Sequence, residues 1–165
     1  MKVINMFAGP GAGKSTLAAG LFYEMKKRGF LVELVTEYAK EKVWENSIET
    51  MSDQLYMLSK QNRKLERLRG KVDYVITDSP LLLGGHYGKK YGLHPEIVVP
   101  LSRLIYETYD NLEFFIKRSK PFDPRGRLGS ERNAIQDDKE ILEVLKSPII
   151  VEYNNESISY MMGVL

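Results

Sequence analysis

The stretch Ala8-Gly9-Pro10-Gly11-Ala12-Gly13-Lys14-Ser15-Thr16 decides the fold of this 165-residue chain. Its spacing matches G-x-x-x-x-G-K-[ST], a pattern typical of loops that hold phosphate groups between a strand and a helix. Alanine at position 8 replaces the first glycine with another small residue. The apolar run Val3 to Phe7 precedes the stretch, and helical spacing follows from Ser15 to Arg28. We call residues 8–16 the phosphate loop.

The residue types of this loop suit a nucleotide's phosphates. Glycines let backbone N–H groups turn inward, and the start of a helix adds the positive end of its dipole. Lys14 is expected to reach the β- and γ-phosphates, and Ser15 to bind Mg²⁺. We therefore predict ATP and Mg²⁺ as cofactors. The predicted nucleotide-binding residues in the loop are Gly9, Pro10, Gly11, Ala12, Gly13, Lys14, Ser15 and Thr16.

Outward from the loop, apolar strands alternate with helical segments. The strands are expected at residues 3–7, 31–36, 72–77, 112–117 and 149–153. Helices are expected at 15–28, 37–45, 53–69, 96–109 and 131–146, with Leu55, Ile135 and Leu142 among their inward residues, and a last short helix after residue 153. Four glycines make residues 81–94 look like a loop. This alternation predicts an α/β fold with a doubly wound parallel sheet, whose ligands lie at the carboxyl ends of the strands.

Length and composition exclude several classes of protein. The length suits a single domain over residues 1–165, and a charged fraction of 28% is ordinary for a globular protein. The absence of cysteine excludes disulfides and cysteine-based zinc sites. A net charge of +2 permits a polyanionic partner without arguing for one. No apolar run is long enough to span a bilayer, so we expect a cytoplasmic protein without membrane contact.

Two acidic residues stand directly after predicted strands. Asp78 follows Val72 to Thr77 and is the predicted second metal ligand with Ser15, although it could simply cap the turn before Pro80. Glu37 follows Leu31 to Thr36, where a carboxylate can orient and deprotonate an acceptor hydroxyl. Its alternative role is a favourable charge at a helix start. The base could be either carboxylate.

A basic segment follows the fourth predicted strand and is expected to form a lid over about residues 118–131. Arginine forks can clamp a phosphoryl group during transfer and neutralise its developing charge. Arg125 and Arg127 flank a glycine and are predicted to be catalytic, and Arg118 is predicted to contact the nucleotide. The alternative is a solvated basic loop.

Several other polar and aromatic residues could either contact a substrate or have an ordinary structural position. Gln54, Gln61 and Arg63 could contact a base or a phosphate, or form the exposed side of a helix. Tyr87 and Tyr91 could stack on a base, although ordinary packing is the simpler reading. The isolated histidines, His86 and His94, make a poor metal signal.

Four motifs together resemble bacteriophage P-loop kinases. They are the phosphate loop, Thr-Glu-Tyr-Ala-Lys-Glu at residues 36–41, Ile-Thr-Asp-Ser-Pro at 76–80, and the Pro-x-Gly-Arg segment of the lid. These kinases stand near the nicotinamide riboside and thymidylate kinases, and some phosphorylate 5-hydroxymethyluracil in phage DNA. The resemblance implies a five-stranded sheet in the order 2-3-1-4-5 with a lid between strands four and five. It also implies adenine contacts near the loop after residues 149–153.

The chain also departs from its nearest kinase groups. It lacks the Asp-Arg-[Tyr/His] of thymidylate kinases after strand three and the Glu-Arg-Ser of deoxynucleoside kinases, with Thr77-Asp78-Ser79 instead. The acceptor therefore stays open among a nucleoside, a nucleotide and a hydroxymethylated pyrimidine in DNA, as does the oligomeric state. The competing hypothesis is an NTPase switch or binding module that hydrolyses ATP without an acceptor.

Overall fold

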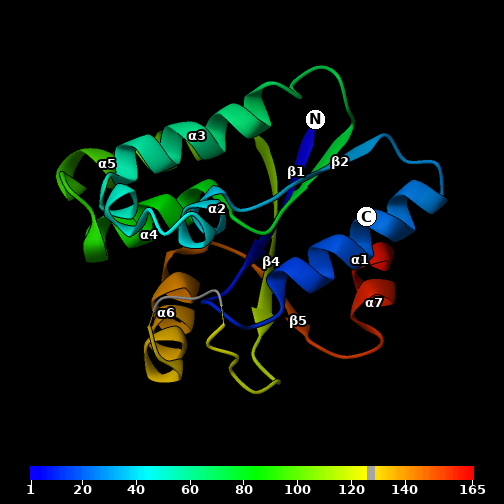
Figure 1. Cartoon of the computed structure of the whole chain (residues 1–165). Helices are drawn as coiled ribbons and strands as arrows, with labels where there is room; N and C mark the ends of the chain where they lie inside the picture. Colours follow the sequence, from blue (N-terminus) through cyan, green and yellow to red (C-terminus); the bar gives the residue numbers. More distant parts are fainter. Residues whose placement is uncertain (126–128) are drawn as a thin grey trace.

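A five-stranded, all-parallel sheet forms the centre of the molecule (Figure 1). The structure is a computed structural model, and it describes residues 1–125 and 129–165. Its strands are β1 (Lys2–Phe7), β2 (Val32–Val35), β3 (Tyr74–Thr77), β4 (Asp110–Lys117) and β5 (Ile149–Glu152). Their order is β2-β3-β1-β4-β5. The α/β fold class and the strand order are thus confirmed.

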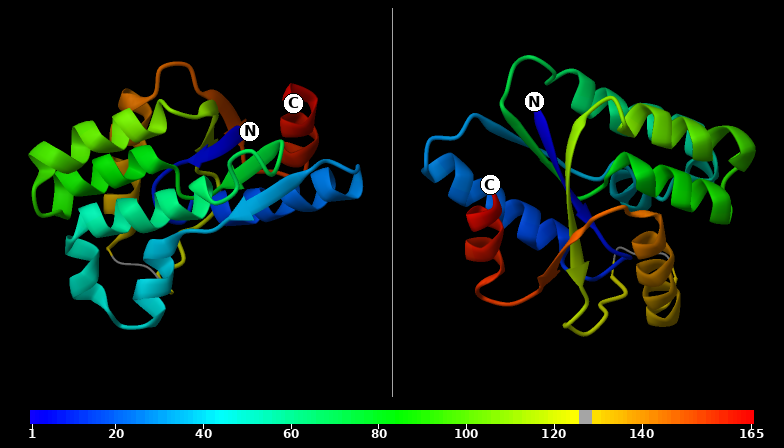
Figure 2. Two further views of the ribbon diagram at one scale, coloured as in Figure 1. Left: turned by 90° about the horizontal axis from the view of Figure 1, so that it is seen from above. Right: turned by 180° about the vertical axis from the view of Figure 1, so that it is seen from behind.

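Helices cover both faces of the sheet (Figure 2). Described in chain order, they are α1 (Lys14–Lys27), α2 (Tyr38–Trp44), the 3₁₀ helix η1 (Ile48–Ser52), α3 (Gln54–Glu66), α4 (Leu81–Tyr91), α5 (Pro95–Tyr106), α6 (Glu131–Val144) and α7 (Ser157–Val164). In the described part of the chain, no helix is both long and apolar enough to cross a bilayer.

Alternation along β1 creates two separate apolar cores. Ile4 and Met6 face the core shared with α1 and α7, while Val3 and Phe7 face the core built with α3, α4 and α5. Successive side chains of a strand point to opposite faces, so a strand buried on both sides reads as a continuous apolar run. This is why the first strand could be recognised from its sequence.

The segment after β3 corrects one sequence expectation, because residues 81–91 form helix α4 and not a glycine-rich loop. A Cβ on Gly85 would lie 2.3 Å from the Ser102 Oγ, and one on Gly88 would lie 2.8 Å from the Val98 Cγ1. These glycines allow α4 and α5 to pack closely, since any side chain would hold the helices apart. Their function is therefore helix contact and not chain flexibility.

The buried faces of two other helices also differ from expectation. Leu55 on α3 is 39% exposed, and Ile135 and Leu142 on α6 are 43% and 40% exposed. The inward face of α6 instead carries Ala134, Asp137 and Ile141. A search for apolar periodicity misses this face of α6, because the face includes the Asp137 carboxylate, whose partners lie on α4.

Candidate active site

The phosphate loop joins β1 to α1 at the carboxyl edge of the sheet. Gly11 and Gly13 have φ angles of +84° and +109°, a left-handed conformation that strongly favours glycine. A Cβ on Gly13 would also lie 2.4 Å from the Tyr153 ring, which packs against the loop. The loop therefore needs glycine at these positions for its backbone conformation and for close packing.

Lys14 begins α1 and its side chain turns back over the loop. Its Nζ donates hydrogen bonds to the carbonyl oxygens of Ala8 and Gly9, at 2.8 Å and 3.1 Å. Burial lowers the pKa of Lys14, against the opposing effect of the Glu37, Asp78 and Asp138 carboxylates. The ammonium is thus held within the loop, and its desolvation favours an anionic partner.

Asp78 follows β3 and is only 4% exposed. Its Oδ1 is fully buried and has no hydrogen-bond partner among the described residues. Ser15, at the first turn of α1, is exposed and lines the nearby cavity. A carboxylate oxygen and a serine hydroxyl are hard oxygen ligands, so Asp78 and Ser15 fit Mg²⁺ chemically.

Arg118 follows β4 and lies against α6. Its Nε donates to the Asp138 Oδ2 at 2.8 Å, while Nη1 is buried without a partner in the described part of the chain. That nitrogen lies 3.2 Å from the position that a Cβ on Gly11 would take. Arg118 therefore places an unused hydrogen-bond donor beside the phosphate loop.

The structure describes only one of the two arginines predicted to act from a lid. Arg125 lines the cavity, and its exposed guanidinium pairs with Asp123, which raises the arginine's pKa. Arg127 lies outside the described residues. Lys120 also lines the cavity, with its ammonium 4.6 Å from the centroid of the Tyr153 ring.

A cavity of about 680 Å³ extends from the phosphate loop to helices α3 and α4. Glu37 lines it from the start of α2, where its extended backbone (φ −62°, ψ 121°) turns the chain into the helix. The negative charge of Glu37 acts to raise the pKa of Lys14, so this carboxylate lies close enough to the phosphate loop to interact with its lysine electrostatically. The lining contributed by the predicted site residues consists of Pro10, Gly11, Gly13, Lys14, Ser15, Thr16, Glu37 and Arg125.

Gln54 and Gln61 are more central than the sequence indicated. Both are buried, at 7% and 6% exposure, and both line the cavity. The Gln61 Oε1 accepts a hydrogen bond from the Tyr38 N–H at 3.0 Å, and its Nε2 donates to the Thr36 carbonyl at 3.4 Å. Gln61 thereby fixes the backbone on both sides of Glu37. A polar residue on an amphipathic helix gives no sequence signal for such a role.

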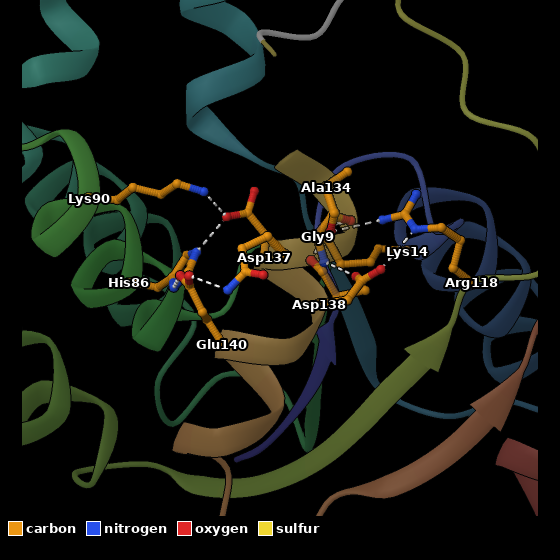
Figure 3. A network of polar contacts seen from close by, with 11 residues as sticks. Gly9, Lys14, His86, Lys90, Arg118, Ala134, Asp137, Asp138 and Glu140 are labelled. Atoms are coloured by element: carbon orange, nitrogen blue, oxygen red, sulfur yellow. Dashed lines mark hydrogen bonds and ion pairs between the residues drawn. The ribbon is translucent and has the colours of Figure 1, made fainter. Parts of the chain in front are cut away.

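A second polar network joins α6 to α4 (Figure 3). The Asp137 Oδ1 lies 3.0 Å from the His86 Nε2 and 2.5 Å from the Lys90 Nζ. Burial alone would raise the pKa of Asp137, but hydrogen bonds from His86 and Lys90 hold it below its usual value. His86, Asp137 and Glu140 have a spacing that could suit a metal, yet Lys90 already supplies a cation at the central carboxylate.

The chain matches no protein-family profile and no curated protein sequence. Among solved structures, it resembles a deoxyadenosine kinase from M. mycoides with bound dATP. The TM-score is 0.57 at 20% identity, over 98% of this chain and 97% of that one. It also resembles a thymidylate kinase from Candida albicans, with a TM-score of 0.58 at 12% identity over 98% and 88% of the two chains. At these identities the likeness establishes a P-loop kinase fold.

Proposed function

We propose that this protein is an ATP-dependent phosphotransferase that moves the γ-phosphoryl group of ATP to a hydroxyl. The observation that carries the proposal is that the phosphate loop and Glu37 open onto one cavity. A donor site and a carboxylate suited to deprotonating an acceptor thus lie within the same space. Residues 1–165 would act as one domain, with a lid over about residues 118–131.

On the donor side, backbone N–H groups of the loop would bind the phosphates. Lys14 and Arg118 would bring cationic donors to them. Ser15 and Asp78 would hold Mg²⁺, which when bound neutralises charge on the β- and γ-phosphates. Arg125, and Arg127 beyond the described residues, would approach from the lid.

On the acceptor side, Glu37 would orient the hydroxyl and accept its proton as the oxygen attacks the γ-phosphorus, while the bond to the bridging oxygen breaks and ADP leaves. Gln61 supports this assignment, because it fixes the backbone on both sides of Glu37. The lid would exclude water and so favour transfer to the acceptor over hydrolysis. Most of the rate would come from positioning and charge neutralisation.

The acceptor belongs, in this proposal, to one of three classes: a nucleoside, a nucleotide, or a hydroxymethylated pyrimidine in DNA. The four sequence motifs favour the last of these. Tyr87 and Tyr91 supply aromatic faces on the acceptor side of the cavity, and Gln54 supplies an amide there. Such groups suit a planar base, since aromatic rings stack on it and amides pair with its edge.

A direct test measures ATP consumption with each acceptor class. The acceptors are nucleosides, nucleoside monophosphates, and duplex DNA containing 5-hydroxymethyluracil, with thymine-containing DNA as the matched control. Lys14→Ala is expected to abolish transfer, while Lys27→Ala, at the exposed end of α1, should retain it. Steady phosphate release from ATP that no acceptor alters would instead identify an NTPase.

A further inference from the structure

Two adjacent carboxylates on α6 face different parts of the active site. Consecutive helix residues are separated by about 100° around the axis, so Asp137 and Asp138 can contact different elements. Asp138 contacts the phosphate loop and Arg118, and Asp137 contacts α4 (Figure 3). We call Asp137 and Asp138 the aspartate pair. Both side chains are largely buried, at 5% and 15% exposure.

Asp138 joins the phosphate loop to the arginine that follows β4. Its Oδ1 accepts a hydrogen bond from the Gly9 N–H at 2.6 Å, and its Oδ2 accepts from the Arg118 Nε at 2.8 Å. A single carboxylate thus fixes the guanidinium relative to the loop. Because the Nε contact leaves Nη1 beside Gly11 without a partner among the described residues, the orientation suits a phosphate oxygen as the acceptor.

Asp137 makes the equivalent connection on the acceptor side. Its Oδ1 contacts His86 and Lys90, which lie one turn apart on α4. The same helix contributes Leu83, Gly84 and Tyr87 to the cavity. The position of this cavity wall therefore depends on a carboxylate from the helix that follows the lid.

We propose that the aspartate pair are positioning residues, with Asp138 orienting Arg118 toward nucleotide phosphates and Asp137 fixing α4 as the acceptor-side wall. The first half rests on the proposed function, because it assigns Arg118 to a nucleotide. The second half concerns only the protein's own contacts. Helix α6, which begins at Glu131, thereby connects the donor and acceptor sides.

Calorimetric titration with Mg-ADP tests the Asp138 half. Asp138→Asn should weaken binding by roughly 10- to 100-fold, the usual scale for a charged hydrogen bond. Glu143→Gln makes the same charge change at an exposed position on α6 and should stay within about 2-fold of wild type. Wild-type affinity in Asp138→Asn would overturn this half. If Asp138→Asn is unfolded at the titration temperature, Arg118→Lys tests the contact from the other side, with the same expected loss.

A double-mutant cycle separates positioning from general structural support. If Asp138 acts through Arg118, adding Asp138→Asn to Arg118→Gln should change Mg-ADP affinity by less than about 2-fold. If the loss of affinity in the double variant equals the product of the two single losses, the residues act independently and the proposal is contradicted. Absence of Mg-ADP binding by the wild type would refute the proposed function together with this half.

Hydrogen exchange tests the Asp137 half without any ligand. Asp137→Asn should speed amide exchange in residues 81–91, because the substitution removes the negative charge that contacts His86 and Lys90 on α4. Asp138→Asn should leave exchange in that helix at the wild-type rate. Unchanged exchange in Asp137→Asn, or equal acceleration in both variants, would overturn the division of roles.

Discussion

Gly9→Ala is the substitution that probes most directly how closely α6 packs on the phosphate loop. A Cβ at position 9 would lie 2.4 Å from the Ala134 carbonyl oxygen and 3.1 Å from the Asp137 Cβ. The first atom belongs to helix backbone, so it cannot turn aside as a side chain could. Either α6 or the loop must move to accept the methyl group.

The expected destabilisation follows from this geometry. Overpacking of a tight contact costs typically about 1–3 kcal/mol, and a rigid backbone neighbour places this site at the upper end. Replacing glycine with alanine also stabilises the folded protein by about 0.4–1 kcal/mol, because it lowers the conformational entropy of the unfolded chain. The net loss is therefore about 2 kcal/mol, which lowers the melting temperature by about 4–8 °C for a chain of this length.

Urea unfolding monitored by circular dichroism measures this loss. Gly163→Ala is the matched control, because Gly163 occupies helix α7 and no atom of the described residues lies within 4 Å of its added Cβ. It should keep or raise stability, by up to about 1 kcal/mol. If Gly9→Ala unfolds at the wild-type urea concentration, α6 does not pack on the loop as described.

Three further predictions concern the chemistry and its pH dependence. Glu37→Gln should still bind ATP but slow phosphoryl transfer by about 10²–10⁴-fold; a normal rate in single-turnover kinetics would exclude Glu37 as the base and make Asp78 the next candidate. Asp78→Asn should raise the Mg²⁺ concentration needed for nucleotide binding by roughly 10–100-fold, and an unchanged titration would exclude it from the metal site. Because the folded pKa of Asp137 is depressed, its contacts stabilise the protein fully above about pH 4 and are lost as pH falls further. The stability gap between wild type and Asp137→Asn should therefore shrink between neutral and strongly acidic urea unfolding, and a constant gap would refute the assignment.

The sequence predicts the sheet well, because each strand is an apolar run and the phosphate loop marks the first strand–helix junction. It fails at α4, where Gly85 and Gly88 suggested a loop. Glycine frequency cannot distinguish a flexible segment from a helix that packs closely on another. Only the positions of Ser102 and Val98 on α5 reveal the difference.

The candidate site also contains residues that the sequence indicates and residues that it does not. The placement of Lys14 and Ser15 beside the cavity can be predicted, since it depends on local spacing, while their roles toward a nucleotide stay predictions. Asp137 and Asp138 could not, because their partners lie at Gly9, His86, Lys90 and Arg118, far away in the chain. Single-sequence patterns carry no information about contacts over such separations, so these residues look like ordinary polar positions on a helix.

Calorimetry of Mg-ATP binding to the wild-type protein and to Lys14→Ala tests the central claim most directly. The wild type should bind one nucleotide saturably and in an Mg²⁺-dependent manner. Removal of the ammonium should weaken this binding by roughly 10–100-fold, while the melting temperature without nucleotide stays close to wild type. Equal affinity in the two proteins, or no binding of any magnesium nucleotide to the wild type, would contradict the assignment of residues 8–16 as a phosphate-binding loop.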